Sequence, residues 1–258
     1  MTHHLFAFDI DGTLFNDKKE ILPSTKEALS SLQKNGHFVM IATGRSLKQA
    51  RPIIDELKLT SYLLCNGAAG FIDNVMIYKN MLSKHKIQAM IEVAKQHQLD
   101  IAMITLHGEY RQELRLNKIT EEAMQSFGPW IPEYRPLSEI DEDVCQAVLF
   151  CNEEQEKYFD AFKDDFRFVR WHPYGVDILP KENSKAHALK EIARIKGLSN
   201  DQLYAFGDGN NDYEMLAEVG HGIAMGNAVE RTKEVAEFVT DDCNHDGIYK
   251  ALKHYDFI

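Results

Sequence analysis

The sequence lacks the features that would place the chain in a membrane or on nucleic acid. Across its 258 residues, no apolar run approaches the ~20 residues of a membrane span. No charged leader followed by an apolar stretch is visible, so we expect no signal peptide. Lys and Arg number 29 against 40 Asp and Glu, and the formal net charge of -11 argues against nucleic-acid binding through a basic face.

Cysteine is also sparse, and its spacing excludes two further classes. The four cysteines, Cys65, Cys145, Cys151 and Cys243, form no Cys-x-x-Cys pair. We therefore expect reduced thiols in a cytoplasmic protein, not a disulfide framework or a zinc site. The hydrophobic content of 44% suits one large or two modest globular domains.

The most informative stretch is the first apolar run and the turn that follows it. Leu5–Phe8 lead directly into Asp9 and Asp11, and a short apolar run before a glycine turn is typical of a strand buried on both faces. Because side chains alternate along a strand, the two carboxylates would point the same way if the strand continued. Buried carboxylates need a neutralising partner, and Mg²⁺ is the usual hard cation for oxygen ligands. An ordinary Asp-Gly turn is the alternative.

Strands and helices alternate through the first 82 residues. The apolar patterns predict strands at 5–8, 38–42 and 62–65, separated by helices that start near Pro23 and after Ser46. This order predicts parallel βαβ units, in which ligands bind beyond the carboxyl ends of the strands. The polar residues that follow these strands are Asp9, Asp11, Thr43, Gly44 and Asn66.

From about residue 83 the pattern changes and then reverts. The sequence predicts helices at 85–97, 119–127 and 153–166, a helix break at 128–132, and strands at 101–104, 144–150, 168–171 and 175–180, with 108–116 as a possible hairpin partner. After residue 182 the α/β pattern resumes, with a helix at 185–195 and a buried strand at 203–206. We expect an α/β fold: a Rossmann-like parallel sheet core with helices on both faces (1–82 and 183–258) and an inserted α+β domain (83–182).

Two further turns could carry chemistry. Thr43 and Gly44 offer a hydroxyl and a backbone N–H at a helix start, which is a typical anion site, although Thr43 or Ser46 could simply cap that helix. The turn Gly207–Asp212 places Asp208 and Asp212 at the end of another strand. A helix cap explains part of this second turn, but two acidic turns at one sheet edge supply the oxygen ligands that Mg²⁺ prefers.

The ordered set of motifs identifies a family. Asp9-x-Asp11-Gly12-Thr13, Thr43-Gly44-Arg45, Lys185 and Gly207–Asp212 together resemble the haloacid dehalogenase (HAD) superfamily of phosphatases. The large insert after the third strand resembles the cap of the Cof-type branch, called type IIB. The resemblance extends over the whole chain, whereas the motifs themselves lie in the two core segments.

The resemblance implies roles for the residues at the strand ends. Asp9 would be the nucleophile, and Asp11 would be the general acid and then the base, which requires neighbours that raise its pKa above that of Asp9. The resemblance implies the following ligands: for Mg²⁺, Asp9, Asp11, Asp208 and Asp212; for the phosphoryl group, Thr43, Gly44, Lys185 and Asn211. Ala186 stands where the family commonly has glycine, and Lys181 is an alternative candidate for the lysine.

The resulting prediction is a Mg²⁺-dependent phosphatase that forms an aspartyl-phosphate. Its substrate would be a small phosphorylated metabolite, either a sugar phosphate or a flavin or nucleotide phosphate. A phosphomutase on the same scaffold and a non-catalytic phosphometabolite-binding protein are the alternatives. The inserted cap would exclude water and read the leaving group, with Arg111, Arg115, Arg170, His172 and Tyr174 as exposed candidates. We expect a monomer or a homodimer.

Overall fold

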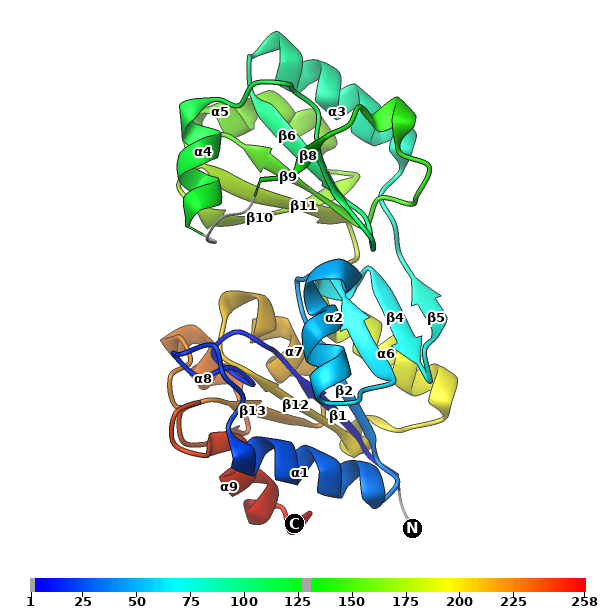
Figure 1. Ribbon diagram of the computed structural model, residues 1–258, viewed down its shortest axis with the longest axis vertical. Helices are drawn as coiled ribbons and strands as arrows, with labels where there is room; N and C mark the ends of the chain where they lie inside the picture. The colour runs from blue at the N-terminus through cyan, green and yellow to red at the C-terminus, as the bar shows by residue number, and fades with distance from the viewer. Residues whose placement is uncertain (1–2, 127–130) are drawn as a thin grey trace. The chain divides into compact units, whose positions relative to one another are not determined.

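A computed structural model describes residues 3–126 and 131–258, which form two compact units. The first unit contains the N-terminal segment up to Arg45, Ala50–Lys79 and Ser184–Ile258. The second contains Ser46–Gln49 and Asn80–Asn183. Each unit has a sheet of its own (Figure 1). Each unit also has its own cluster of buried hydrophobic residues.

The first unit is built on an eight-stranded sheet with the order β14-β13-β12-β1-β2-β3-β4-β5. Its strands are β1 (Leu5–Phe8), β2 (Phe38–Ala42), β3 (Ser61–Leu64), β4 (Ala69–Ile72), β5 (Val75–Lys79), β12 (Leu203–Gly207), β13 (His221–Ala224) and β14 (Phe238–Val239). The six strands from β14 to β3 pair in parallel, and β1 lies between β12 and β2. The predicted Rossmann-like core is confirmed.

Strand β1 is apolar throughout because both faces of the sheet are covered. Leu5 and Ala7 belong to a core cluster that includes residues of α6 (Lys185–Lys196) and α7 (Tyr213–Glu218). Phe8, which points to the opposite face, stacks on Phe206 with ring centroids 4.7 Å apart. The remaining helices of this unit are α1 (Pro23–Lys34), α2 (Leu47–Glu56), α8 (Glu230–Val235) and α9 (Gly247–His254).

An antiparallel hairpin follows β3, and the sequence reading did not predict it. Strands β4 and β5 pair antiparallel, with Ile72 opposite Val75, so the loop is two residues long. Both loop residues, Asp73 and Asn74, have positive φ values of 50° and 61°. A two-residue Asp-Asn loop between apolar runs is a hairpin signal, because these residues tolerate the left-handed conformation.

The second unit contains a six-stranded, mainly antiparallel sheet with the order β10-β11-β9-β6-β7-β8. Its strands are β6 (Asp100–Ile104), β7 (Glu109–Arg111), β8 (Glu133–Tyr134), β9 (Gln146–Phe150), β10 (Phe166–His172) and β11 (Gly175–Pro180). Its helices are α3 (Lys84–Gln96), α4 (Lys118–Gln125) and α5 (Glu153–Glu156). The predicted α+β character of the insert is confirmed, and β7 is the expected hairpin partner of β6.

Two predicted elements of the insert have different limits. The helix expected at 153–166 ends after one turn as α5 and continues as a 3₁₀ helix, Lys157–Phe162, while Phe166 already begins β10. Phe159 is fully buried in the core of this unit, which holds the tighter turn in place. The end of the helix expected at 119–127 and most of the break at 128–132 lie outside the described residues. No helix among the described residues is long and apolar enough to cross a membrane.

Histidines and aromatic rings gather at the amino end of β1. The ring of His4 lies 5.3 Å from that of His37 and 5.1 Å from that of Phe257, measured between centroids. The Nδ1 atom of His4 is buried and has no hydrogen-bond partner among the described residues. Burial, with the charges of His221 and His3, lowers the pKa of His4, and burial also lowers that of His37.

These lowered pKa values predict a loss of stability in acid. The unfolded histidines, with pKa values near 6.5, bind more protons than the folded ones, so stability falls as the pH drops below about 6.5. We expect His4→Phe to reduce the fall in melting temperature between pH 7.5 and pH 5.5. Thermal unfolding monitored by circular dichroism measures this, with the exposed His85→Gln as control. An unchanged pH dependence in His4→Phe would contradict the prediction.

Candidate active site

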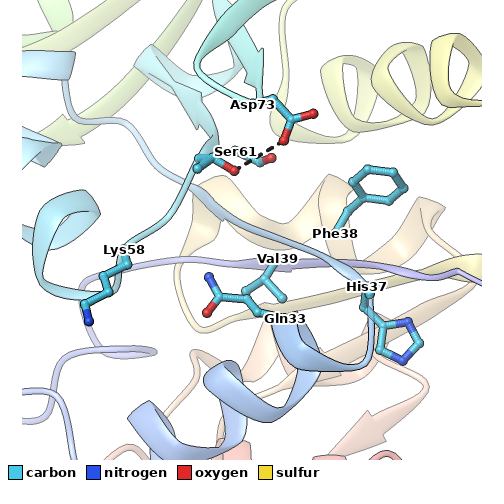
Figure 2. Close-up of a pocket in the computed structure, with 9 residues that line it drawn as sticks. Gln33, His37, Phe38, Val39, Lys58, Ser61 and Asp73 are labelled. Atoms are coloured by element: carbon cyan, nitrogen blue, oxygen red, sulfur yellow. Dashed lines mark hydrogen bonds between the residues drawn. The ribbon is translucent and has the colours of Figure 1, made fainter.

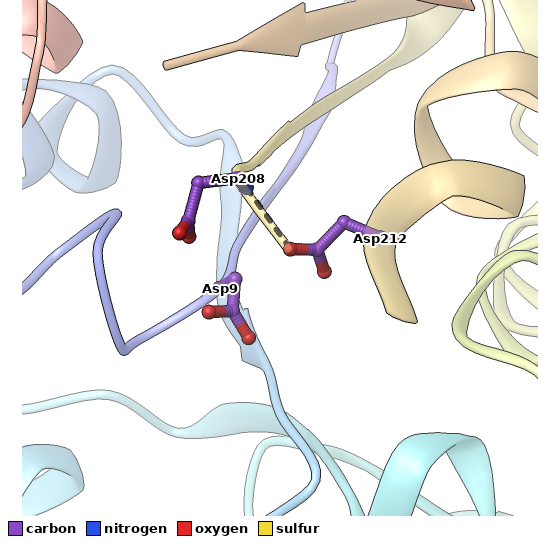
Figure 3. Close-up of side chains that lie close together, drawn as sticks. All are labelled: Asp9, Asp208 and Asp212. Carbon is purple, nitrogen blue, oxygen red and sulfur yellow. Dashed lines mark hydrogen bonds between the residues drawn. The ribbon is translucent and has the colours of Figure 1, made fainter. Parts of the chain in front are cut away.

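Asp9 lies at the carboxyl end of β1, where the sheet has already ended. Its backbone N–H donates to the carbonyl of Phe206 at 2.9 Å, which fixes Asp9 beside the end of β12. Its side chain is 10% exposed. One ligand oxygen each from Asp9, Asp208 and Asp212 lie within 4.8 Å of one another (Figure 3). Carboxylates from two distant segments therefore meet at the predicted edge of the sheet.

Lys185 neutralises part of this acidic cluster. Its ammonium donates to Asp9 Oδ1 and to Asp212 Oδ1, both at 2.6 Å, and its side chain is 1% exposed. The residue begins α6, after the N-cap Ser184, whose hydroxyl accepts the N–H of His187. A cation is unfavourable at a helix N-terminus, so the two carboxylates must compensate for that position.

Asp212 shapes the turn that carries Asp208. Its Oδ2 atom accepts the backbone N–H of Asp208 at 3.0 Å (Figure 3). The same atom also accepts the backbone N–H of Gly209 at 3.0 Å. A Cβ atom on Gly207 would lie 2.6 Å from the side chain of Asp212, so this position needs glycine. One carboxylate oxygen of Asp212 therefore accepts from Lys185 and the other from the turn.

The turn that follows β1 also contacts Asp208. Its Oδ1 accepts the Thr13 hydroxyl at 2.9 Å. Gly12 has a φ of +81°, and a Cβ atom there would lie 2.3 Å from Asp208 Oδ2. Glycine thus allows both the left-handed turn and the close approach of this carboxylate.

The donor set fits a hard divalent cation. Three carboxylates and one ammonium leave two negative charges when all four groups are ionised. Burial, with the neighbouring Asp212, raises the pKa of Asp9 to about 7, although Lys185 opposes this, and burial with Asp212 raises that of Asp208 to about 6. Oxygen ligands whose ionised forms are destabilised in this way are stabilised by a bound cation.

Asp11 does not join the cluster, because the strand does not continue as the common direction of the two carboxylates would require. Strand β1 ends at Phe8, so the alternation does not reach Asp11. Its carboxylate accepts from the Arg45 guanidinium at 2.8 Å and from the Lys19 ammonium at 2.8 Å. Burial favours the neutral acid, but these two cations outweigh it and hold the pKa of Asp11 below its usual range.

The pKa values of Asp9 and Asp11 therefore have the opposite order to the one expected. The general acid was expected to have the higher pKa, whereas that of Asp9 is raised and that of Asp11 is lowered. The physical reason is that the buried carboxylate lies among other carboxylates, while the half-exposed one lies between two cations.

The predicted phosphate-binding residues lie along the neighbouring strand ends. Thr43 is buried, and its hydroxyl accepts the backbone N–H of Arg45 at 3.2 Å. A Cβ atom on Gly44 would meet Asn66 at 3.0 Å. The amide of Asn211 donates to the Asn66 side chain at 3.4 Å. Asn66 thus connects the Thr43-Gly44-Arg45 motif with the turn Gly207–Asp212.

Four residues near the site were not predicted as functional: Thr13, Lys19, Arg45 and Asn66. Three of them, Thr13, Arg45 and Asn66, lie in turns that directly follow predicted parallel strands. That position at a strand end could have indicated that they lie near the site. Lys19 gave no such signal, because its contact with Asp11 depends on a loop in which Lys19 has a φ of 59°.

Three other sequence candidates, Lys181, Arg170 and Arg111, have hydrogen-bond partners within the second unit. Lys181 donates to the carbonyl of Lys163 within the second unit, which leaves Lys185 as the buried lysine. Arg170 donates to Glu156 at 2.8 Å and to the carbonyl of Cys151 at 3.0 Å. Arg111 likewise donates to main-chain carbonyl groups, among them that of Pro132.

A pocket of about 410 Å³ lies elsewhere in the first unit (Figure 2). Phe38 and Ser61, two of its lining residues, begin β2 and β3. This pocket is therefore at the amino ends of the parallel strands, and the acidic cluster is at their carboxyl ends. Ligands of such sheets bind at the carboxyl ends, so we assign no catalytic role to the pocket.

Comparison with known proteins agrees with this geometry. The haloacid dehalogenase-like hydrolase family matches residues 6–252. Putative phosphatase YkrA of Bacillus subtilis (strain 168) is 36% identical over 253 residues, 98% of each chain. The 5-amino-6-(5-phospho-D-ribitylamino)uracil phosphatase YcsE of the same organism is 31% identical, over 97% of this chain and 95% of its own. The structure of the HAD subclass IIB sugar phosphatase BT4131 has a TM-score of 0.83 at 30% identity and covers 99% of this chain and 100% of its own.

The chain belongs to the haloacid dehalogenase-like hydrolases. The predicted family, including the Cof-type branch with a type IIB cap, is confirmed, and so is the predicted class of enzyme, a phosphatase. A metal ion is general in this family, and the acidic cluster provides a site for one.

Removal of the buried ammonium should destabilise the fold strongly. Lys185→Met leaves Asp9 and Asp212 buried beside each other without a counter-charge, and the loss of one partner from a buried ion pair costs about 3–5 kcal/mol. Urea unfolding at pH 8 with a chelator present measures this free energy. Lys190→Met, on the same helix, removes an exposed pair with Glu218 and should cost less than about 1 kcal/mol. Equal losses in the two variants would contradict the prediction.

Proposed function

We propose that this protein is a Mg²⁺-dependent phosphatase that hydrolyses a small phosphorylated metabolite through an aspartyl-phosphate on Asp9. The observation that carries the proposal is the cluster of Asp9, Asp208 and Asp212 around a buried lysine at the carboxyl end of the parallel sheet. Phosphoryl transfer needs a positioned nucleophile and neutralisation of charge on the phosphoryl oxygens, and the cluster offers both.

Asp9 is the proposed nucleophile. Lys185 holds one of its oxygens and fixes the side chain, so that the other oxygen is available for attack on phosphorus. The new Asp9 O–P bond forms as the bond to the leaving alkoxide breaks. Water then attacks phosphorus, the aspartyl-phosphate O–P bond breaks, and inorganic phosphate leaves. Thr43, the Gly44 N–H, Lys185 and Asn211 are the proposed partners of the phosphoryl oxygens.

Asp11 is the proposed proton carrier for both steps. Once protonated from solvent, it gives that proton to the leaving alkoxide, and the carboxylate that results then takes one from the attacking water. Its carboxylate must first leave Arg45 and Lys19, because these cations stabilise the ionised form. The side chain of Asp11 is 46% exposed, so it can rotate away from the two cations into solvent. We infer that binding of an anionic phosphoester competes for the two cations and releases Asp11.

Mg²⁺ is the cation that we propose for the cluster. Asp9 and Asp208 are the proposed side-chain ligands, and Asp11 would contribute through its backbone carbonyl. Asp212 would support these ligands through its hydrogen bond with the backbone N–H of Asp208. When bound, the ion supplies charge neutralisation for the phosphoryl group. The chemistry of three oxygen donors with an excess of two negative charges supports a small hard divalent cation over a soft one.

The substrate class and the setting are also proposals. YcsE is named as a phosphatase of a ribitylamino phosphate, and BT4131 as a sugar phosphatase. We therefore propose that the substrate is a small polyol or sugar phosphate, or a flavin-type phosphate. We propose residues 83–182 as the cap domain that reads the leaving group, with 1–82 and 183–258 as the catalytic core. A cytoplasmic location is supported by free cysteines that are all buried.

The central test is phosphate release from a panel of sugar phosphates, nucleotides, flavin mononucleotide and p-nitrophenyl phosphate. We expect release with Mg²⁺, loss of release with a chelator, and a loss of at least about 10³-fold for Asp9→Asn, because covalent catalysis needs the ionised carboxylate. Asp55→Asn, a surface change, is the control. Activity that survives Asp9→Asn would refute the proposed nucleophile.

The role of Asp11 has a separate test. Asp11→Asn should reduce kcat/KM for an alkyl phosphate by about 10²–10⁴-fold, which is the usual contribution of general acid–base catalysis. The loss should be much smaller for p-nitrophenyl phosphate, whose leaving group needs no proton. Because kcat/KM reports the first transfer step, the comparison isolates the acid role. Equal losses for both substrates would exclude Asp11 as the general acid.

A further inference from the structure

The loop that follows β13 contacts the turn after β1 and the turn after β12, which carry the acidic residues of the site. Met225 donates its backbone N–H to the carbonyl of the last residue of β12, and Val229 donates to the carbonyl of Asp208, both at 3.0 Å. Between these two residues, the side-chain amide of Asn227 donates to the carbonyl of Gly12 at 2.8 Å. One short loop therefore joins the two turns.

The amide of Asn227 is bound at both of its ends. Its Oδ1 atom accepts the backbone N–H of Cys243 at 3.0 Å, while its nitrogen donates to Gly12. A carbonyl can only accept and a backbone N–H can only donate, so these two partners fix the direction of the amide. The side chain of Asn227 is exposed, so its contribution is a directed hydrogen-bond donor and not the filling of a core.

Gly12 lies between two of the proposed metal ligands. Its nitrogen belongs to the peptide bond whose carbonyl is that of Asp11, and a Cβ atom on Gly12 would lie 2.3 Å from Asp208 Oδ2. The position needs glycine, with a φ of +81°, yet glycine is the residue with the greatest backbone freedom. A hydrogen bond to the Gly12 carbonyl restricts that freedom and thereby holds the Asp11 carbonyl and the Asp208 carboxylate at a constant separation.

We propose that Asn227 is a positioning residue for the metal site and acts through Gly12. The inference rests on the Mg²⁺ site proposed above, and it adds a residue that lies outside both the predicted motifs and the acidic cluster. Partners that orient metal ligands typically contribute about 10–100-fold to metal affinity. Loss of the Asn227 amide should therefore weaken Mg²⁺ binding, while the fold is kept because the side chain is exposed.

Asn244 provides a matched control on the same pair of chain segments. Its exposed side chain accepts the backbone N–H of Asp17 at 3.2 Å and donates to Asp17 Oδ2 at 3.1 Å. Alanine at either asparagine therefore removes two side-chain hydrogen bonds between the N-terminal loop and the C-terminal part of the first unit, or within that part. Asp17 carries no proposed ligand, whereas Gly12 adjoins two of them.

The test uses Mg²⁺ alone and the melting temperature of the full-length protein. For each variant, we measure the Mg²⁺ concentration that raises the melting temperature by about 2 °C, which scales with the dissociation constant of the ion. We expect this concentration to rise at least about tenfold in Asn227→Ala and to change less than about twofold in Asn244→Ala. Asn227→Gln keeps an amide donor on an exposed side chain and should recover most of the loss.

A purely structural role of Asn227 gives a different result. The two alanine variants would then lose similar melting temperature without Mg²⁺ and would respond to Mg²⁺ as the wild type does. That result overturns the inference, and so does an equal loss of Mg²⁺ response in Asn227→Ala and Asn244→Ala, or in Asn227→Ala and Asn227→Gln. A wild-type protein that does not respond to Mg²⁺ refutes the proposed metal site and this inference with it, whereas a wild-type response that Asn227→Ala retains refutes this inference alone.

Discussion

The interaction on which the rest of the site depends is the buried ammonium of Lys185 between Asp9 and Asp212. Each contact is 2.6 Å long, and both carboxylates are almost fully removed from water. Without this cation, the ends of β1 and β12 would bring three carboxylates together with no positive charge between them, and burial already raises the pKa of two of these groups, Asp9 and Asp208. With it, two negative charges remain, which is the charge that one divalent cation balances. Lys185 therefore limits how much charge a metal has to neutralise.

The same ion pairs connect parts of the chain that the insertion separates. Asp9 directly follows the first strand, whereas Lys185 and Asp212 follow the second unit in sequence, 176 and 203 positions later. Parallel pairing of β1 with β12 brings the two segments side by side, and the lysine then joins them at the strand ends. These contacts between Asp9, Lys185 and Asp212 lie wholly within the first unit.

The sequence predicted the strand ends well and the side-chain directions poorly. Apolar runs that stop at Asp9 and Asp208 identify buried parallel strands, and the topology of such sheets then fixes which edge holds the site. The direction of Asp11 depended on whether the strand continued by two more residues, which local pattern does not determine. Lys185 looked unfavourable at a helix start because its compensating carboxylates are distant in sequence. The hairpin at 73–74 carries a recognisable sequence signal, an Asp-Asn pair between two apolar runs.

Two carboxylates separated by one residue therefore receive opposite environments. Asp9 is buried among acidic neighbours and is fixed by a rigid lysine, which suits an atom that must attack from one direction. Asp11 is half exposed and bound to the long side chains of Lys19 and Arg45, which suits a group that must move and exchange protons. The end of β1 at Phe8 creates this difference, because it frees the backbone after Asp9 to turn Asp11 outward. A strand longer by two residues would direct both carboxylates to the same face, and the proposed mechanism would then lack a mobile proton carrier.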